Sequence, residues 1–159
     1  MTPAVFAQAL RETKDFFDRS TRCLTEEHSD YTPNEELMTV AQQVAHVAQT
    51  FDWFIDGAFN RPDGFDMNFE GLMKSVVAVE SLQAAREWLD KSVASAVQTI
   101  ASKTMEELME RLPEGPIMGG EPKLTIVSAI GDHTAHHRGV LTVYSRMAGL
   151  VPPMPYMDM

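Results

Sequence analysis

Apolar residues recur every three or four positions in four long stretches of the chain, which is the spacing of amphipathic helices. The stretches cover approximately residues 2–25, 39–58, 81–100 and 124–148, and none of the sequence alternates convincingly with the two-residue period of a strand. This pattern favours an all-α fold, and we expect a four-helix bundle formed by a single domain over residues 1–159. The positions expected to face the core are Phe6, Leu10, Phe17 and Leu24, then Val40, Val44, Val47, Phe51, Phe54 and Ala58, then Leu82, Ala85, Leu89, Val93, Val97 and Ile100, and finally Ile126, Ile130, Leu141, Tyr144 and Ala148.

The residues at the ends of these stretches are typical of helix termini. Thr2, followed by a proline, begins the first helix. Thr39 is followed three residues later by Gln42, a capping-box pattern, and Ser81 is a favoured residue type before the first turn. Gly149 suits the position just after the last turn of the fourth helix. The helix boundaries are therefore encoded locally.

The connections are less regular. Residues 26–38 read as a loop, and residues 65–79 are irregular apart from a short helical pattern near their end. Residues 104–112 resemble a short capped helix, which is followed by a glycine-containing loop over 113–122. Residues 151–156 are expected to be extended because their prolines are incompatible with a helix.

Composition narrows the possible functions. The formal net charge is −10 and no cluster of Lys and Arg opposes it, so binding to nucleic acid is disfavoured. No run of apolar residues is long enough for a membrane span, and the N-terminus lacks the layout of a signal peptide, so we expect a cytoplasmic protein. The only cysteine, Cys23, excludes an internal disulfide and a cysteine-rich zinc module. A metal site would therefore need histidine and carboxylate ligands.

Two histidines occupy core-facing positions of the fourth helix. His133 and His137 lie four residues apart, so their side chains share one face of a helix and can converge on one ion. Two neighbouring imidazoles in an apolar row are costly to bury without a shared partner. The alternative is a pair of packed histidines that the core satisfies, since H-x-x-x-H alone is a weak motif. The HExxH pattern of zinc proteases is absent because Thr134 stands where it requires glutamate.

The third ligand is expected from the second helix. His46 lies at the edge of its apolar face, and on its own it is more typical of a hydrogen-bonded core histidine. Combined with His133 and His137, it predicts a three-histidine site with a coordination position open to water or substrate. Thr50, Trp53 and Tyr144 share helix faces with these ligands and are candidates for the pocket wall.

Two neighbours of the pair are candidates for a supporting role. Asp132 can hydrogen-bond the free N–H of a ligand imidazole, although an exposed helical aspartate is equally consistent with the sequence. His136 lies about 100° around the helix from His137, so we expect it beside the site rather than among the ligands. Arg138 is expected to have a packing or ion-pairing role.

The order of these residues resembles the DinB/YfiT-like metalloprotein family. The resemblance rests on His46 with Trp53 seven residues later, the string at 133–139 (HTAHHRG), the string at 144–149 (YSRMAG), and the prolines that follow. It implies a four-helix bundle, usually a homodimer, with a divalent metal, often nickel or zinc, bound by residues matching His46, His133 and His137. Some relatives use a low-molecular-weight thiol in S-transfer or isomerisation. The chain departs from the family at Val140, where glutamine is frequent.

Two functions follow as alternatives. In the first, the chain is a metal-dependent enzyme, a thiol S-transferase or a hydrolase, which acts on a small electrophilic substrate at the open position. In the second, the chain is a non-catalytic, stress-related bundle in which the metal supports the fold or the dimer. A fourth protein ligand on the ion would favour the second alternative.

Overall fold

The computed structural model describes residues 1–157. In this part of the chain all regular elements are helical, and the only β-type pairing is an isolated bridge between Arg111 and Pro122. The prediction of an all-α fold is confirmed. The long helices are α1 (Pro3–Thr21), α2 (Val40–Phe59), α4 (Leu82–Ser102) and α6 (Ile126–Met147), the shorter ones are α3 (Phe69–Val77) and α5 (Met105–Met109), and the 3₁₀ turns are η1 (Glu26–His28) and η2 (Lys123–Thr125).

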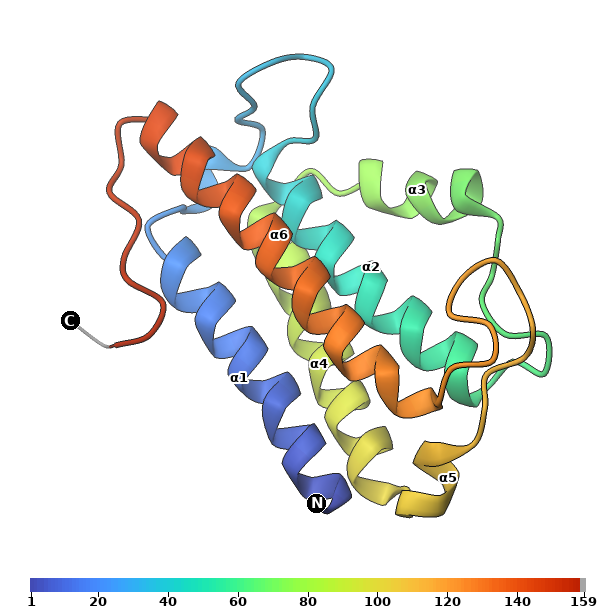
Figure 1. Ribbon diagram of the computed structural model, residues 1–159. Coiled ribbons are helices and arrows are strands. Elements are labelled where there is room, and N and C mark those ends of the chain that lie inside the picture. Colours follow the sequence, from blue (N-terminus) through green and yellow to red (C-terminus); the bar gives the residue numbers. More distant parts are fainter. Residues whose placement is uncertain (158–159) are drawn as a thin grey trace.

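The long helices pack side by side with roughly aligned axes (Figure 1). α1 and α2 each have extensive contacts with both α4 and α6, so the order around the bundle is α1, α4, α2, α6. α1 and α6 run in one direction, and α2 and α4 run in the other. The segment between α1 and α2 therefore crosses one end of the bundle. The neighbouring antiparallel pair α2 and α6 carries the three histidines of interest.

The predicted core is buried with few exceptions. Every apolar position expected to face inward has a buried side chain except Phe6 and Ala148, which are half-buried. Leu24 is buried although α1 ends at Thr21, before the predicted boundary at residue 25. After α1 the chain turns into η1, which Thr25 caps. The backbone N–H of Thr25 donates to His28 Nδ1 over 3.1 Å.

Several helix ends lie where the capping residues in the sequence predict them. The backbone N–H of Gln42 donates to Thr39 Oγ1 over 3.3 Å, and the backbone N–H of Thr39 donates to Gln42 Oε1 over 3.0 Å. These two bonds complete the predicted capping box. Gly149 has φ +80°, and the Leu150 N–H donates to the Ser145 carbonyl over 2.8 Å, which closes α6 in a Schellman arrangement.

Other boundaries differ from the prediction. The short helix expected over 104–112 ends at Met109, because the backbone of Glu110 is already extended. The last helix begins with the 3₁₀ turn η2 and becomes α-helical only at Ile126. The irregular segment before α4 contains α3, a regular helix of nine residues.

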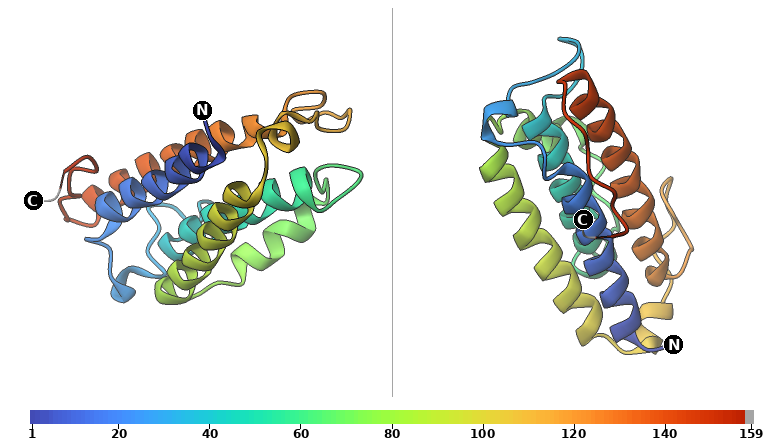
Figure 2. Two further views of the ribbon diagram at one scale, coloured as in Figure 1. Left: turned by 90° about the horizontal axis from the view of Figure 1, so that it is seen from below. Right: turned by 90° about the vertical axis from the view of Figure 1, so that its left-hand side faces the viewer.

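The C-terminal segment turns back along α1 after α6 ends (Figure 2). Arg19 donates to the Pro155 carbonyl over 3.2 Å, and the ring of Tyr156 meets Phe16 edge to face at 5.3 Å between centroids. Residues 151–154 form no helix, as their prolines predict, whereas residues 155 and 156, which were also expected to be extended, lie in a turn. Within residues 1–157, none of the helices combines the length and apolar character that a bilayer crossing requires.

Candidate metal centre

The packing of α2 against α6 brings the three predicted ligand histidines together. His46 comes from α2, and His133 and His137 come from successive turns of α6. Their ring centroids are 4.9 Å apart for His46 and His133, 4.8 Å for His46 and His137, and 4.5 Å for His133 and His137. One candidate ligand nitrogen from each ring lies within 4.8 Å of the other two. The cluster is therefore compatible with a single metal ion.

The separation of two ring nitrogens fits one shared ion. Nε2 of His46 and Nε2 of His133 are 3.3 Å apart. Two nitrogens that bind zinc at about 2.0–2.1 Å with a tetrahedral angle lie roughly 3.3–3.4 Å from each other. Within the described residues, the buried Nδ1 atoms of His46 and His133 have no hydrogen-bond partner. An ion bound to the two Nε2 atoms would leave these Nδ1 atoms unpaired, so the support for a shared ion is the Nε2 separation and the preference of divalent transition metals for neutral imidazole nitrogens.

The third ring is oriented by a glutamine, Gln43, that is not among the predicted site residues. Nδ1 of His137 lies 2.6 Å from Oε1 of the buried Gln43. Because an amide oxygen only accepts hydrogen bonds, Nδ1 carries the proton and Nε2 keeps a free electron pair. This is the usual arrangement around a metal-binding histidine, whose other nitrogen donates to a fixed acceptor. The available signal was the position of Gln43 three residues before His46, on the same face of α2.

The electrostatics favour neutral rings. Burial, followed by the neighbouring histidines, lowers the pKa of His133 to about 4 and that of His137 to about 3. Burial also lowers the pKa of His46, against an opposing contribution from the Gln49 side chain. Neutral imidazoles present electron pairs rather than positive charges, so a cation meets no proton competition at neutral pH.

Two of the proposed wall residues lie beside the histidines. Thr50 and Trp53 line a cavity of about 300 Å³ together with His46 and His133. The Thr50 hydroxyl donates to the His46 carbonyl over 2.9 Å, and its oxygen is 3.5 Å from Nε2 of His133. The full lining is His46, Gln49, Thr50, Trp53, Phe54, Phe69, Leu72, Met73, Ile117 and His133.

The remaining candidates lie away from the cavity. Tyr144 is buried two turns after His137, and its hydroxyl donates to the Met38 carbonyl over 3.0 Å. Asp132 is exposed and acts on His133 through its charge, which opposes the lowering of the pKa of His133. His136 is exposed, with its ring edge to face against His137 at 4.9 Å between centroids.

Arg138 packs against aromatic rings. Its guanidinium carbon lies 5.9 Å from the ring centre of Phe16 and 5.7 Å from that of Tyr156. Cation–π contacts of this kind hold the C-terminal segment against α1 and α6. The arginine that follows the histidine string therefore has a packing role.

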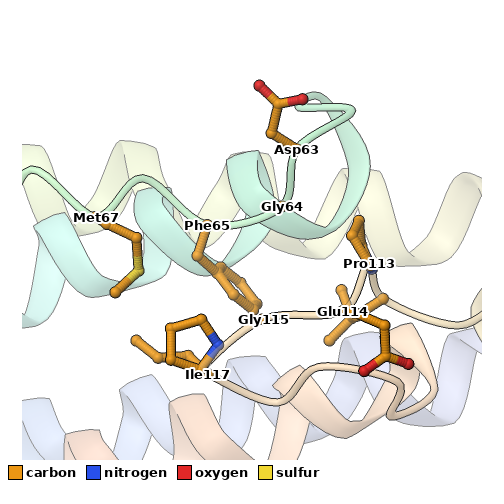
Figure 3. A pocket seen from close by; sticks show the side chains of 10 residues that line it. Asp63, Gly64, Phe65, Met67, Pro113, Glu114, Gly115 and Ile117 are labelled. Carbon is orange, nitrogen blue, oxygen red and sulfur yellow. The ribbon is translucent and has the colours of Figure 1, made fainter.

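A second, smaller cavity of about 90 Å³ lies between two loops (Figure 3). The loops cover residues 63–67 and 112–117, and Phe65 and Ile117 point into the space between them. Ile117 also lines the cavity beside the histidines. The loop after α5 thus borders both spaces, although the smaller one contains none of the three clustered histidines.

Known proteins resemble this chain in sequence family and in fold. The model of the DinB family matches residues 1–159. The fold is similar to the crystal structure of a DinB-like protein from Bacillus cereus ATCC 10987, with a TM-score of 0.73 over 96% of each chain at 20% sequence identity. The search of curated proteins gave no significant match. The match over the full length shows that the chain belongs to the DinB family.

Proposed function

We propose that the chain binds one divalent metal ion through His46, His133 and His137 and uses it catalytically on a small electrophilic substrate, by thiol S-transfer or by hydrolysis. The observation that carries the proposal is the convergence of three imidazoles next to a cavity of about 300 Å³. Among the described residues, no fourth His, Cys, Asp or Glu joins this cluster. Three protein ligands with one open position are typical of catalytic zinc sites, whereas structural sites usually have four.

The chain's own residues prepare the site for this chemistry. A bound divalent ion would supply Lewis acidity, which activates water or a thiol at neutral pH. Gln43 holds the His137 ring with Nε2 directed away from the hydrogen bond. The Thr50 hydroxyl donates its proton to the His46 carbonyl, so that proton does not occupy the Nε2 electron pair of His133. The cavity beside the histidines is lined mainly by hydrophobic side chains, Trp53 among them.

The finer features of this proposal come from the resemblance of the histidine string to its family. We propose nickel or zinc as the metal, a low-molecular-weight thiol as co-substrate, and a homodimer as the functional form. Nitrogen donors bind both metals well, so the ligand set is consistent with either.

A non-catalytic role is the second candidate, and the placement of the ligands supports it. His46 belongs to α2, whereas His133 and His137 belong to α6, so an ion would cross-link two helices and stabilise the fold. An assay for substrate turnover distinguishes the catalytic role from the non-catalytic one. The catalytic proposal predicts metal-dependent conjugation of a bimane electrophile with bacillithiol or glutathione, or metal-dependent hydrolysis of an activated ester. Bound metal without either reaction would favour the structural role.

The ligand assignment is tested by elemental analysis of protein purified without a histidine tag. We expect about one divalent ion per chain in the wild type and its loss in His137→Ala, because two ligands rarely retain an ion. His136→Ala is the matched control, since His136 is adjacent in sequence but exposed and outside the cluster. Stoichiometric metal in His137→Ala would exclude His137 as a ligand.

A further inference from the structure

The cavity beside His46 and His133 has an apolar lining. Six of its ten described lining residues are hydrophobic, and none of the ten carries a carboxylate, ammonium or guanidinium group. The polar groups are Gln49, Thr50 and the two imidazoles. The six hydrophobic residues are Trp53, Phe54, Phe69, Leu72, Met73 and Ile117.

The helix that covers the cavity leaves its apolar side only partly packed. Val76 is the one buried residue of α3. Leu72 and Met73 are half-buried and Phe69 is 48% exposed, yet all three line the cavity. An amphipathic helix on a bundle normally buries its apolar side against core side chains. Here that side borders open space, which a ligand of matching polarity can fill.

The Trp53 side of the cavity is held in place by contacts within the protein. The Trp53 indole N–H donates to the Asp66 carbonyl over 2.8 Å, so its hydrogen-bonding need is met by the protein. The indole also stacks on Phe65, with 4.6 Å between centroids and 29° between planes. Phe65 in turn packs against Gly57, where a Cβ atom would lie 2.2 Å from Phe65 Cδ1. The Trp53 face is therefore fixed before any ligand arrives.

We infer that the substrate of the metal centre carries an uncharged aromatic group, which occupies this cavity while its reacting atom lies beside His46 and His133. The inference rests on the proposed function and specifies its substrate class. A charged group would be buried here without a counter-charge, at a high free-energy cost. The volume of about 300 Å³ lies at the lower end of the range of small-molecule sites, which suits a compact ring system.

Three probes with the same metal-binding ring separate the contributions of the ion and the cavity. They are imidazole, 4-phenylimidazole and 4-(imidazol-4-yl)benzoate, titrated into cobalt-loaded protein. Binding is followed by Trp53 fluorescence in a Trp88→Phe background, since Trp88 lies apart from the cavity and donates to Asp52. We expect 4-phenylimidazole to bind about tenfold or more tightly than imidazole, and the carboxylate to bind more weakly than imidazole.

A variant pair on α3 tests the location. Leu72→Glu places a charge in the cavity wall and should remove the preference for 4-phenylimidazole while imidazole binding persists. Val77→Glu is the control on the same helix, because Val77 is 51% exposed and outside the lining. Equal affinities for imidazole and 4-phenylimidazole, or an unchanged preference in Leu72→Glu, would overturn the inference and leave the metal site intact.

The metal-free protein provides the remaining comparison. There, 4-phenylimidazole should still change Trp53 emission while imidazole does not, because the cavity wall does not depend on the ion. If the protein does not bind cobalt, the proposed function is wrong, but the change in Trp53 emission caused by 4-phenylimidazole can still be measured. Absence of the response in both the metal-free and the cobalt-loaded protein overturns the cavity assignment.

Discussion

The hydrogen bond between His137 and Gln43 makes a buried glutamine a positioning residue of the proposed metal site. Replacing Gln43 with leucine removes the acceptor and leaves the His137 Nδ1–H unsatisfied in a buried environment. Changes to such supporting partners typically lower metal affinity by about 10–100-fold. We therefore expect Gln43→Leu to weaken zinc or nickel binding by that factor, measured by competition with a chromophoric chelator.

Two variants control for unrelated effects of this substitution. Gln43→Glu keeps an acceptor at the same position and should retain most of the affinity. Gln98→Leu, at an exposed site on α4, should leave the affinity unchanged. Wild-type affinity in Gln43→Leu would show that this hydrogen bond does not orient the ligand.

The residue scale also shows how far periodicity can locate a site. His133 and His137 were visible in the sequence because polar rings in an apolar register are unusual. Gln43 shares a face of α2 with His46, but its contact with His137 depends on how α2 is rotated against α6, and the sequence pattern does not specify that rotation. Tyr144 shares a face with His137 but lies roughly 10 Å further along the helix axis, so it contacts Met38 instead.

At the scale of elements, the packing of α2 against the following loop depends on one glycine. A methyl group at Gly57 would lie 2.2 Å from Phe65 Cδ1 and 3.0 Å from Phe65 Cα. Gly57→Ala should therefore displace the ring that stacks on Trp53. We expect a loss of about 1–3 kcal/mol in the free energy of unfolding, because overpacking outweighs the gain in helix propensity. Urea titration and Trp53 fluorescence provide the measurements.

A glycine on another helix provides the matched control. A Cβ at Gly139 in α6 meets nothing within 4 Å. Gly139→Ala should raise the free energy of unfolding by roughly 0.5–1 kcal/mol, since alanine restricts the unfolded chain and favours helix. Equal effects of the two substitutions would contradict the role assigned to the contact between Gly57 and Phe65.

Elements with strong local signals were predicted well, and those that depend on tertiary contacts were not. The capping box at Thr39 and the glycine after α6 are encoded within a few residues, so they could be read directly. α3 is short and buries only Val76, so its apolar pattern was too weak to give firm boundaries. Its importance lies in the cavity that it covers.

For the whole molecule, the sequence indicated helices but not their order around the bundle. Each apolar face requires a partner, which makes an all-α fold predictable from periodicity. The arrangement α1, α4, α2, α6 depends on the crossing segment at residues 22–39, whose loop composition does not encode a path. That arrangement places α2 beside α6, and the candidate site depends on this pairing.

The lowered pKa values of the clustered histidines also couple the stability of the metal-free molecule to pH. The pKa of His133 falls to about 4 in the folded state, from an unfolded value of about 6.5. Between these two values the unfolded chain binds a proton that the folded chain does not, so stability decreases as the pH falls. Above about 6.5 the ring is neutral in both states and contributes no pH dependence.

We therefore expect the chelator-treated wild type to lose more stability between pH 7 and pH 5 than His133→Gln, which lacks this titration. The difference should be about 1–2 kcal/mol at pH 5, allowing for the partial exposure of the ring. Urea unfolding of both proteins at several pH values measures it, and carboxylate titration cancels because the two chains share those groups. Parallel pH profiles would mean that the His133 pKa is not lowered in the folded state. The claim that burial keeps the His133 imidazole neutral, and so ready to bind a metal, would then be wrong.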